Sequence, residues 1–239
     1  MKVVILAGGK GTRLLPYTTV FPKPLMPIGD QPILELVITQ LKSYNFTEII
    51  LAVGHLKELV MAFFSDGTKL GVCINYSVDD RPLGTAGPLG ILRHDLKDTF
   101  LVMNGDVLTT LNFNKIIESH KKSGAIATIA LTKRKVKIDY GVPELDSENN
   151  IIGFSEKPEI SYFVSMGIYL FEPKILEYIG DNQYIDFPDL LKKLIRSNEM
   201  VKGYISDDYW LDIGRVEDYA RANDELKTIY PKLFNMEHK

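Results

Sequence analysis

Cysteine is almost absent from this 239-residue sequence, and so are long hydrophobic runs and any strong excess of charge of one sign. Cys73 is the only cysteine, so no disulfide can form within the chain. Proline, glycine or a charged residue interrupts every apolar stretch before the roughly 20 residues that a membrane-spanning helix needs. With 28 basic and 31 acidic side chains, the formal net charge of -3 provides no field that would attract nucleic acid or an anionic membrane. We therefore expect small-molecule partners, with no nucleic acid and no membrane among them.

The four histidines and the lone thiol offer no recognisable metal or redox motif. The histidines lack metal-ligand spacing, so we interpret them as helix or surface residues: His55, His94, His120 and His238. Cys73 lies in an apolar run, where a buried and unreactive thiol is expected. The first six residues lead directly into a glycine-rich motif rather than into the apolar core of a signal peptide, so we expect a cytoplasmic protein.

Short β-branched runs alternate with helical patterns in the first half of the chain. The runs predict strands over residues 2–7, 48–53, 72–76 and 100–103. Apolar residues at helical spacing predict helices over 32–44 and 55–64. Such an alternation is typical of a mostly parallel sheet, which binds ligands at the carboxyl ends of its strands.

The second half of the chain is richer in strands. Apolar runs separated by turn residues predict strands over 125–132, 141–145, 151–155 and 163–171. Helical patterns return over 187–195 and 216–226. We find neither a linker nor an internal repeat, so one domain is expected over residues 1–230, followed by a tail over 231–239.

The first predicted strand ends in a glycine-rich turn, Leu-Ala-Gly-Gly-Lys-Gly-Thr-Arg. Three glycines allow the backbone to turn tightly and to bring its N–H groups against phosphate oxygens. The turn is not a dinucleotide fingerprint, because Leu14 stands at the third glycine position, and no Gly-Lys-Ser/Thr follows as a Walker loop requires. These departures disfavour an oxidoreductase and a P-loop enzyme. A second motif, Pro-Lys-Pro-Leu around Lys23, comes soon after.

Together, these two motifs resemble the signature of the sugar-nucleotide pyrophosphorylases. The resemblance implies transfer of a nucleotidyl group from a nucleoside triphosphate to a sugar 1-phosphate, with Arg13 and Lys23 stabilising the departing pyrophosphate. It implies a nucleotide site made of Leu6, Ala7, Gly8, Gly9, Gly11, Thr12, Arg13, Lys23, Asp80, Gly84 and Asp106. It also implies a Rossmann-like three-layer α/β/α sandwich with a central mixed, mostly parallel sheet. The nucleotide half would occupy about residues 1–110 and the sugar-phosphate half about 111–230.

Two aspartates in similar settings favour a magnesium site. Asp106 ends the apolar run 100–106, and Asp212 sits in Trp-Leu-Asp-Ile-Gly at 210–214. Magnesium takes one or two carboxylates and completes its octahedron with water and substrate phosphates. Each pattern alone is typical of a turn, whereas the two together behind the glycine-rich turn predict a shared Mg2+ ion, a role that the resemblance also implies.

Three further segments resemble the acceptor-binding elements of the same family. The resemblance assigns the sugar 1-phosphate to Gly141, Glu156, Lys157 and Gly167. Lys157 would bind the phosphate, and Glu156 would accept hydrogen bonds from sugar hydroxyls. One departure stands out: thymidylyl enzymes carry an Arg-Gly-Glu segment where this sequence has Asn-Gln-Tyr-Ile-Asp-Phe-Pro at 182–188, so the phosphate-binding arginine is missing.

The segment 79–89, Asp-Asp-Arg-Pro-Leu-Gly-Thr-Ala-Gly-Pro-Leu, bears on the choice of base. Pyrimidine-specific relatives place a glutamine there, whereas an ionised aspartate accepts hydrogen bonds only and so matches the two adjacent donors of guanine. The run also resembles that of mannose-1-phosphate guanylyltransferases. We therefore predict GTP with mannose 1-phosphate or a related manno-configured sugar. The sequence leaves several alternatives: the enzyme could use UTP, dTTP or CTP, the two aspartates could only face solvent, or the chain could be a catalytically silent regulatory homologue. A homo-oligomer is also possible.

Overall fold

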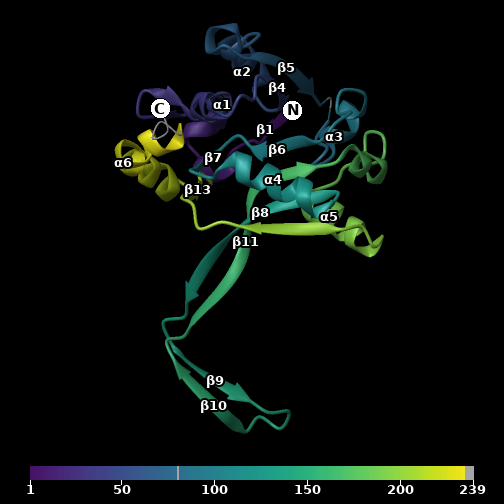
Figure 1. Ribbon diagram of the computed structural model, residues 1–239. Coiled ribbons are helices and arrows are strands. Elements are labelled where there is room, and N and C mark those ends of the chain that lie inside the picture. The colour runs from purple at the N-terminus through teal and green to yellow at the C-terminus, as the bar shows by residue number, and fades with distance from the viewer. Residues whose placement is uncertain (80, 235–239) are drawn as a thin grey trace.

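The computed structural model describes residues 1–79 and 81–234 and shows a three-layered body from which a long β-arm projects (Figure 1). The body is built on a seven-stranded sheet in the order β12–β8–β11–β6–β1–β4–β5, in which β11 alone runs antiparallel to its neighbours. The strands are β1 (Val3–Ala7), β4 (Glu48–Val53), β5 (Cys73–Val78), β6 (Phe100–Asn104), β8 (Ala127–Lys137), β11 (Glu159–Phe171) and β12 (Val201–Ile205). The predicted mixed, mostly parallel sheet is therefore confirmed.

Helices cover both faces of this sheet because alternate residues of each strand are apolar on both sides. In β1, Val3 and Ile5 face a core shared with α1 (Ile33–Ser43), α2 (Lys57–Phe64) and α4 (Phe113–Ser123). Val4 faces the opposite core, which α3 (Pro88–Ile91) and α5 (Phe187–Arg196) close. The predicted three-layer sandwich is confirmed.

A third core joins the C-terminal helix to the beginning of the chain. Helix α6 (Val216–Leu233) buries Ala222, Ile229 and Leu233 against residues of the N-terminal segment, Leu14, Met26 and Ile28. The short strand β13 (Trp210–Asp212) leads into this helix and pairs with β7 (Val107–Thr109); a two-residue ladder, β2 (Pro27–Ile28) with β3 (Gln31–Pro32), lies nearby. Because α6 continues to a buried Leu233, residues 231–233 belong to the folded body rather than to the predicted tail.

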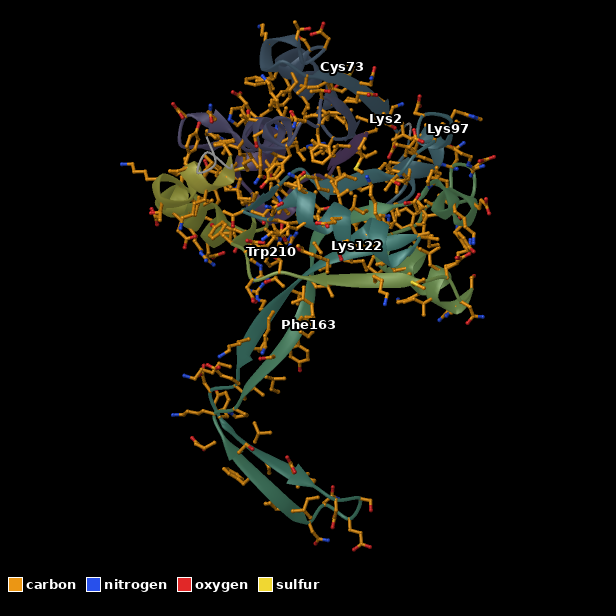
Figure 2. All side chains as sticks on the ribbon, viewed as in Figure 1. Lys2, Cys73, Lys97, Lys122, Phe163 and Trp210 are labelled. Atoms are coloured by element: carbon orange, nitrogen blue, oxygen red, sulfur yellow. The ribbon has the colours of Figure 1, made fainter. Side chains whose placement is uncertain are left out.

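The arm has two parts, which we call the stem and the tip. The stem is the outer portion of β8 and β11, where Leu131–Lys137 pair with residues 159–165; Phe163 marks it in Figure 2. The tip is the hairpin of β9 (Gly141–Leu145) and β10 (Ile151–Glu156), which continues the stem away from the body (Figure 1).

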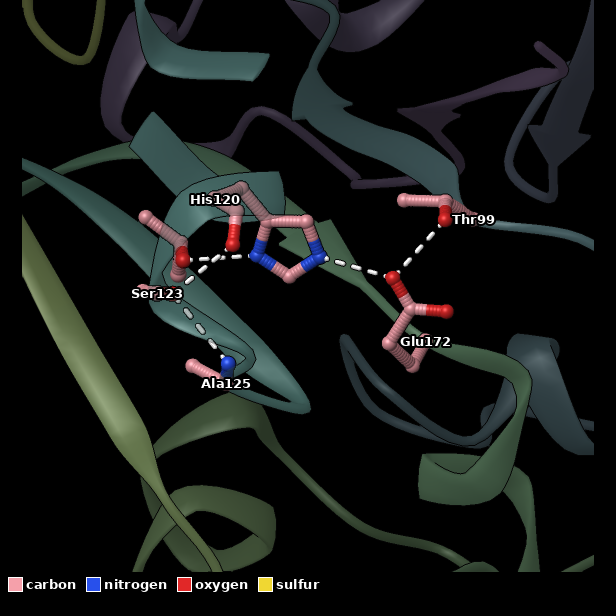
Figure 3. A network of polar contacts seen from close by, with 6 residues as sticks. Thr99, His120, Ser123, Ala125 and Glu172 are labelled. Carbon is pink, nitrogen blue, oxygen red and sulfur yellow. Dashed lines mark hydrogen bonds and ion pairs between the residues drawn. The ribbon is translucent and has the colours of Figure 1, made fainter. Parts of the chain in front are cut away.

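The expectation that Cys73 is buried was wrong, whereas His120 lies on a helix, one of the two places expected for it. Cys73 is exposed and lies at the start of β5, the edge strand of the sheet (Figure 2). His120 lies on a helix but is buried: Nδ1 is 2.7 Å from Thr128 Oγ1, and Nε2 is 3.0 Å from Glu172 Oε1, which also accepts a hydrogen bond from Thr99 (Figure 3). This network fixes α4 to the strands beneath it. Within the described ranges, no helix has the length and apolar character needed to cross a membrane.

Candidate active site

A cavity of about 740 Å³ opens at the carboxyl ends of β1, β4 and β6. Parallel strands place their following loops at one edge of a sheet, which explains why segments far apart in sequence meet here. Ten of the residues predicted to bind a nucleotide line it: Leu6, Ala7, Gly8, Gly9, Gly11, Thr12, Arg13, Lys23, Gly84 and Asp106. Asp80 lies outside the described residues, whereas its neighbour Asp79 lines the cavity.

The glycine-rich turn lies against the loop that follows β4 with no room for side chains between them. A Cβ atom on Gly54 would lie 2.9 Å from the carbonyl oxygen of Gly8, and the same oxygen accepts a hydrogen bond from His55 N at 3.2 Å. Gly11 adopts a left-handed conformation with φ 62°, and its carbonyl accepts a hydrogen bond from Thr18 Oγ1 at 2.8 Å. This packing holds the turn in one conformation before any ligand arrives.

A buried ion pair links the two motifs of the first half. Lys23 starts a short 3-10 helix, Lys23–Leu25, between two prolines, and its side chain is only 10% exposed. Its ammonium contacts the carboxylate of Asp106. Asp106 follows β6 and Gly105, whose N–H donates to the carbonyl of Leu6 at 3.0 Å and thereby fixes the carboxylate beside the glycine-rich turn.

The second aspartate is brought to the same place by β13. In its ladder with β7, Asp212 lies opposite Val107, and Ile213 N donates to the carbonyl of Asp106 at 3.0 Å. Burial, and then the negative charge of Asp106, raises the pKa of the Asp212 carboxyl, while Lys23 and Arg13 oppose the shift. The guanidinium of Arg13 packs over Gly214, where a Cβ would lie 3.1 Å from Nη1. Arg13, Lys23 and Asp106 therefore meet at one edge of the cavity, and Asp212 lies next to Asp106 but is not among the residues that line the cavity.

Another wall of the cavity contains residues that were not predicted from the sequence. Asp186 Oδ1 accepts hydrogen bonds from the backbone N–H of Thr85 at 2.8 Å and from its hydroxyl at 3.1 Å. Tyr184 donates to Asp186 Oδ2 at 3.1 Å, and all three residues line the cavity. In the sequence, segment 182–188 differs from the Arg-Gly-Glu segment of thymidylyl enzymes, and an Asp directly before a predicted helix is the signal for a structural role at position 186. Three further residues line the cavity that were not predicted to do so: Lys10, His55 and Arg81.

The residues predicted to bind the sugar phosphate are divided between two places. Gly167 is not among the residues that line the cavity but lies behind one of them: its φ is 72°, and a Cβ there would lie 2.6 Å from Nδ2 of Asn104, a cavity residue. Gly141, Glu156 and Lys157 lie instead at the junction of stem and tip, where the arm projects from the body (Figure 1). Within one described chain, the structure does not bring these three residues to the cavity.

Comparisons with known proteins agree with this geometry. The family model described as nucleotidyl transferase matches residues 2–229. The chain is 37% identical to UTP–glucose-1-phosphate uridylyltransferase of Synechocystis sp., with 93% of this chain and 62% of the relative covered. It is 34% identical to mannose-1-phosphate guanylyltransferase 1 of Arabidopsis thaliana, with 92% and 63% covered.

A solved structure extends the match to the fold. A protein of Bacillus anthracis, assigned as a glucose-1-phosphate thymidylyltransferase, superposes with a TM-score of 0.77 at 28% identity, with 98% of this chain and 99% of that chain covered. The present chain spans about 62–63% of the length of the two curated relatives above.

Proposed function

Because the chain belongs to the nucleotidyl transferase family, we propose that it transfers a nucleotidyl group from a nucleoside triphosphate to a sugar 1-phosphate and releases pyrophosphate. The observation that carries the proposal is that a glycine-rich turn, Arg13, Lys23 and Asp106 line one cavity, with Asp212 next to Asp106. An oxygen of the acceptor phosphate attacks the α-phosphorus, and the bond to the β-phosphate breaks, with its electron pair leaving on pyrophosphate. This chemistry depends on positioning and on neutralising oxygen charge, and it needs no covalent intermediate.

Arg13 and Lys23 are proposed to act on the triphosphate. Backbone N–H groups of Gly8, Gly9 and Gly11 surround its oxygens, while the two cations stabilise the charge that grows on the departing pyrophosphate. Lys23 suits this role because prolines on both sides hold its backbone. Its contact with Asp106 shows that the ammonium already lies at the edge of the cavity.

Asp106 and Asp212 fit a divalent cation, which we propose to be Mg2+. Their carboxylates are close enough for one to raise the pKa of the other, and a bound cation would remove that repulsion. Among residues 1–79 and 81–234, no group of three or more His, Cys, Asp and Glu side chains suits a metal, and two carboxylates match the sparse protein ligation of magnesium. When bound, the ion would neutralise phosphate oxygens.

The acceptor site is proposed to include Gly167, Gly141, Glu156 and Lys157. Gly167 supports this because it lies against Asn104, which lines the cavity. Gly141, Glu156 and Lys157 are included because of their motifs, and they can act only if the arm reaches a cavity.

For the base we propose GTP, with mannose 1-phosphate or a related manno-configured sugar as acceptor. Asp79 lines the cavity, and its ionised carboxylate would accept from the two adjacent donors of guanine. The curated relatives include both guanylyl and uridylyl enzymes, so a pyrimidine triphosphate is the second candidate. Retention of Arg13, Lys23 and both metal aspartates argues against a silent regulatory homologue.

The test is pyrophosphate release over a matrix of the common nucleoside triphosphates and sugar 1-phosphates, with and without Mg2+. We expect release only with both substrates and a divalent cation, and the highest kcat/KM with GTP. An inactive wild-type chain contradicts the activity. A preference for UTP or dTTP, or unchanged base discrimination in an Asp79→Ala/Asp80→Ala variant, contradicts only the assignment of the base.

A further inference from the structure

The stem is a continuous β-ladder that directs the tip away from its own body. Residues pair without interruption from Leu131 opposite Ser165 to Lys137 opposite Glu159. Six residue steps of about 3.4 Å carry the end of the stem roughly 20 Å beyond the first of these pairs. With the stem leaving the body in this direction, Glu156 and Lys157 do not reach the cavity of their own chain (Figure 1).

One face of the stem is mostly apolar and exposed, although it also carries Arg134 opposite Tyr162. Directly opposed residues of an antiparallel pair point to the same side, so Val136 and Ile160 share a face, and Tyr162 follows two residues later. These side chains are 47%, 39% and 53% exposed. The other face is mostly polar and includes an ion pair between Lys135 and Glu159 at 2.9 Å, but it also carries Phe163, which is 56% exposed. Such alternation is typical of a sheet with one buried face, and a two-stranded ribbon gains independent stability only when that face is packed.

The tip combines further exposed apolar side chains with the predicted acceptor residues. Leu145 and Ile151 lie opposite each other and are both exposed, and Phe154 is 65% exposed. The ring of Phe154 lies against Gly141, where a Cβ would be 2.4 Å from Cζ, and the carboxylate of Glu156 lies beside the same glycine. Any surface that covers this face of the tip therefore also meets the acceptor residues.

The body presents exposed apolar side chains in a segment next to the cavity. Residues 15–21 connect Arg13 to Lys23, which both line the cavity. Four side chains of this segment, which we call the rim patch, are exposed although they are large and apolar: Leu15, Tyr17, Val20 and Phe21. Exposed apolar surface of this kind, beside a functional cavity, marks an interaction site.

We propose that two copies of this chain exchange arms, so that the arm of each packs on the rim patch of the other and delivers Gly141, Glu156 and Lys157 to the partner's cavity. The inference rests on the proposed function, because it needs these residues to bind the acceptor. The same requirement identifies the partner as a second copy of this chain. The arm carries part of the acceptor site, and the second copy carries a cavity that needs this part. Reciprocal exchange closes a two-fold dimer with two complete sites and leaves no open edge for further assembly.

The test is complementation between two inactive variants. Asp106→Asn disables the cavity, and Glu156→Ala/Lys157→Ala disables the arm; each homodimer should fall about 100-fold or more below wild type. The two are coexpressed with different tags, and the heterodimer is purified. With exchanged arms, one of its two sites combines an intact cavity with an intact arm, so about half of wild-type activity is expected per dimer. Glu148→Ala, on the turn of the tip, is the control and should remain fully active.

An independent test compares the oligomeric state of the wild type, measured by sedimentation, with its activity over a series of dilutions. We expect dimers whose activity per chain falls as they dissociate, and we expect Tyr162→Glu on the apolar face of the stem to give folded monomers with low activity. A heterodimer no more active than the homodimers, a fully active monomer, or full activity in the arm variant overturns the exchange. An inactive wild type contradicts the proposed function instead, so the two failures are distinguishable.

Discussion

Replacing Asp186 by alanine tests what stabilises the cavity wall that Thr85, Tyr184 and Asp186 form. Its carboxylate accepts two hydrogen bonds from Thr85 and one from Tyr184. Hydrogen bonds to a charged group contribute about 1.5–3 kcal/mol each when buried, and water replaces part of this at a half-buried site, so we expect a loss of about 1–3 kcal/mol in the free energy of unfolding. For a chain of this size, the melting temperature should fall by about 2–12 °C.

The same change should affect nucleotide binding more than chemistry. Thr85 follows Gly84, whose φ is 76° and whose Cβ position would lie 2.6 Å from the carbonyl oxygen of Ile185, so this loop depends on the 185–186 segment for its shape. A loosened loop should raise KM for the triphosphate and leave kcat nearly unchanged.

The assay combines thermal melting with steady-state kinetics. Asp189→Ala is the matched control, because Asp189 pairs with Lys192 at the surface and should change neither quantity by much. A double-mutant cycle with Thr85→Val should show coupling, since both single changes remove the same hydrogen bond. An Asp186→Ala variant with unaltered melting temperature and unaltered KM would refute the reasoning.

The pH dependence of this variant follows from the sign of the shift. The backbone N–H of Thr85, opposed in part by burial, holds the pKa of Asp186 below its ordinary value. A lowered carboxyl pKa contributes stability above the unfolded pKa and loses it as pH falls through the folded pKa. The difference in melting temperature between wild type and Asp186→Ala should therefore stay constant from pH 8 to pH 5 and shrink below about pH 4.

Three further predictions concern the cavity. Asp212→Asn should lower turnover by about 100-fold or more in the presence of Mg2+, while circular dichroism stays native, because it removes one ligand charge; near-wild-type turnover would exclude the shared cation. Arg13→Ala and Lys23→Ala should each lower kcat more than they raise KM, since leaving-group charge develops only in the transition state, and a pure KM effect would exclude that role. Gly54→Ala should destabilise the fold by about 1–3 kcal/mol, because its Cβ would lie 2.9 Å from a carbonyl oxygen, whereas Gly9→Ala, with no atom within 4 Å, should melt like wild type.

Local patterns were sufficient for most of the sheet and for the cavity. The glycine-rich turn follows a buried strand, and any parallel sheet places such a turn at its carboxyl edge. The residues of the first half that line the cavity could therefore be assigned to one site from the sequence. The helix α4 was missed although its signals were present. Asn112 caps it by accepting a hydrogen bond from Lys115 N at 3.2 Å, and Gly124 ends it in a left-handed conformation. Its buried stripe ends in His120, a polar residue that periodicity does not count as core.

Features that depend on distant partners escaped prediction. Nothing in the run around Cys73 shows that β5 has only one neighbour, so its exposure could not be inferred. The strands of the arm are longer than predicted because pairing between β8 and β11 continues past the apolar runs into Lys133–Lys137, where the sequence favours a solvated loop. Asp186 joins the cavity through Thr85, about a hundred residues earlier in the chain, a contact that only the fold creates.

The packing of α6 on the N-terminal segment determines when the site can form during synthesis of the chain. Residues 1–205 contain every strand of the central sheet, so that sheet can form while the chain is still being made. At about 5–20 residues per second, the segment from β13 to the end of the described chain emerges about 1–5 seconds later. Until then Leu14 and Ile28, which flank the two motif segments, lack the helix that buries them. The site is therefore completed after the sheet that supports it, and we expect a nascent chain to expose this apolar surface during that interval.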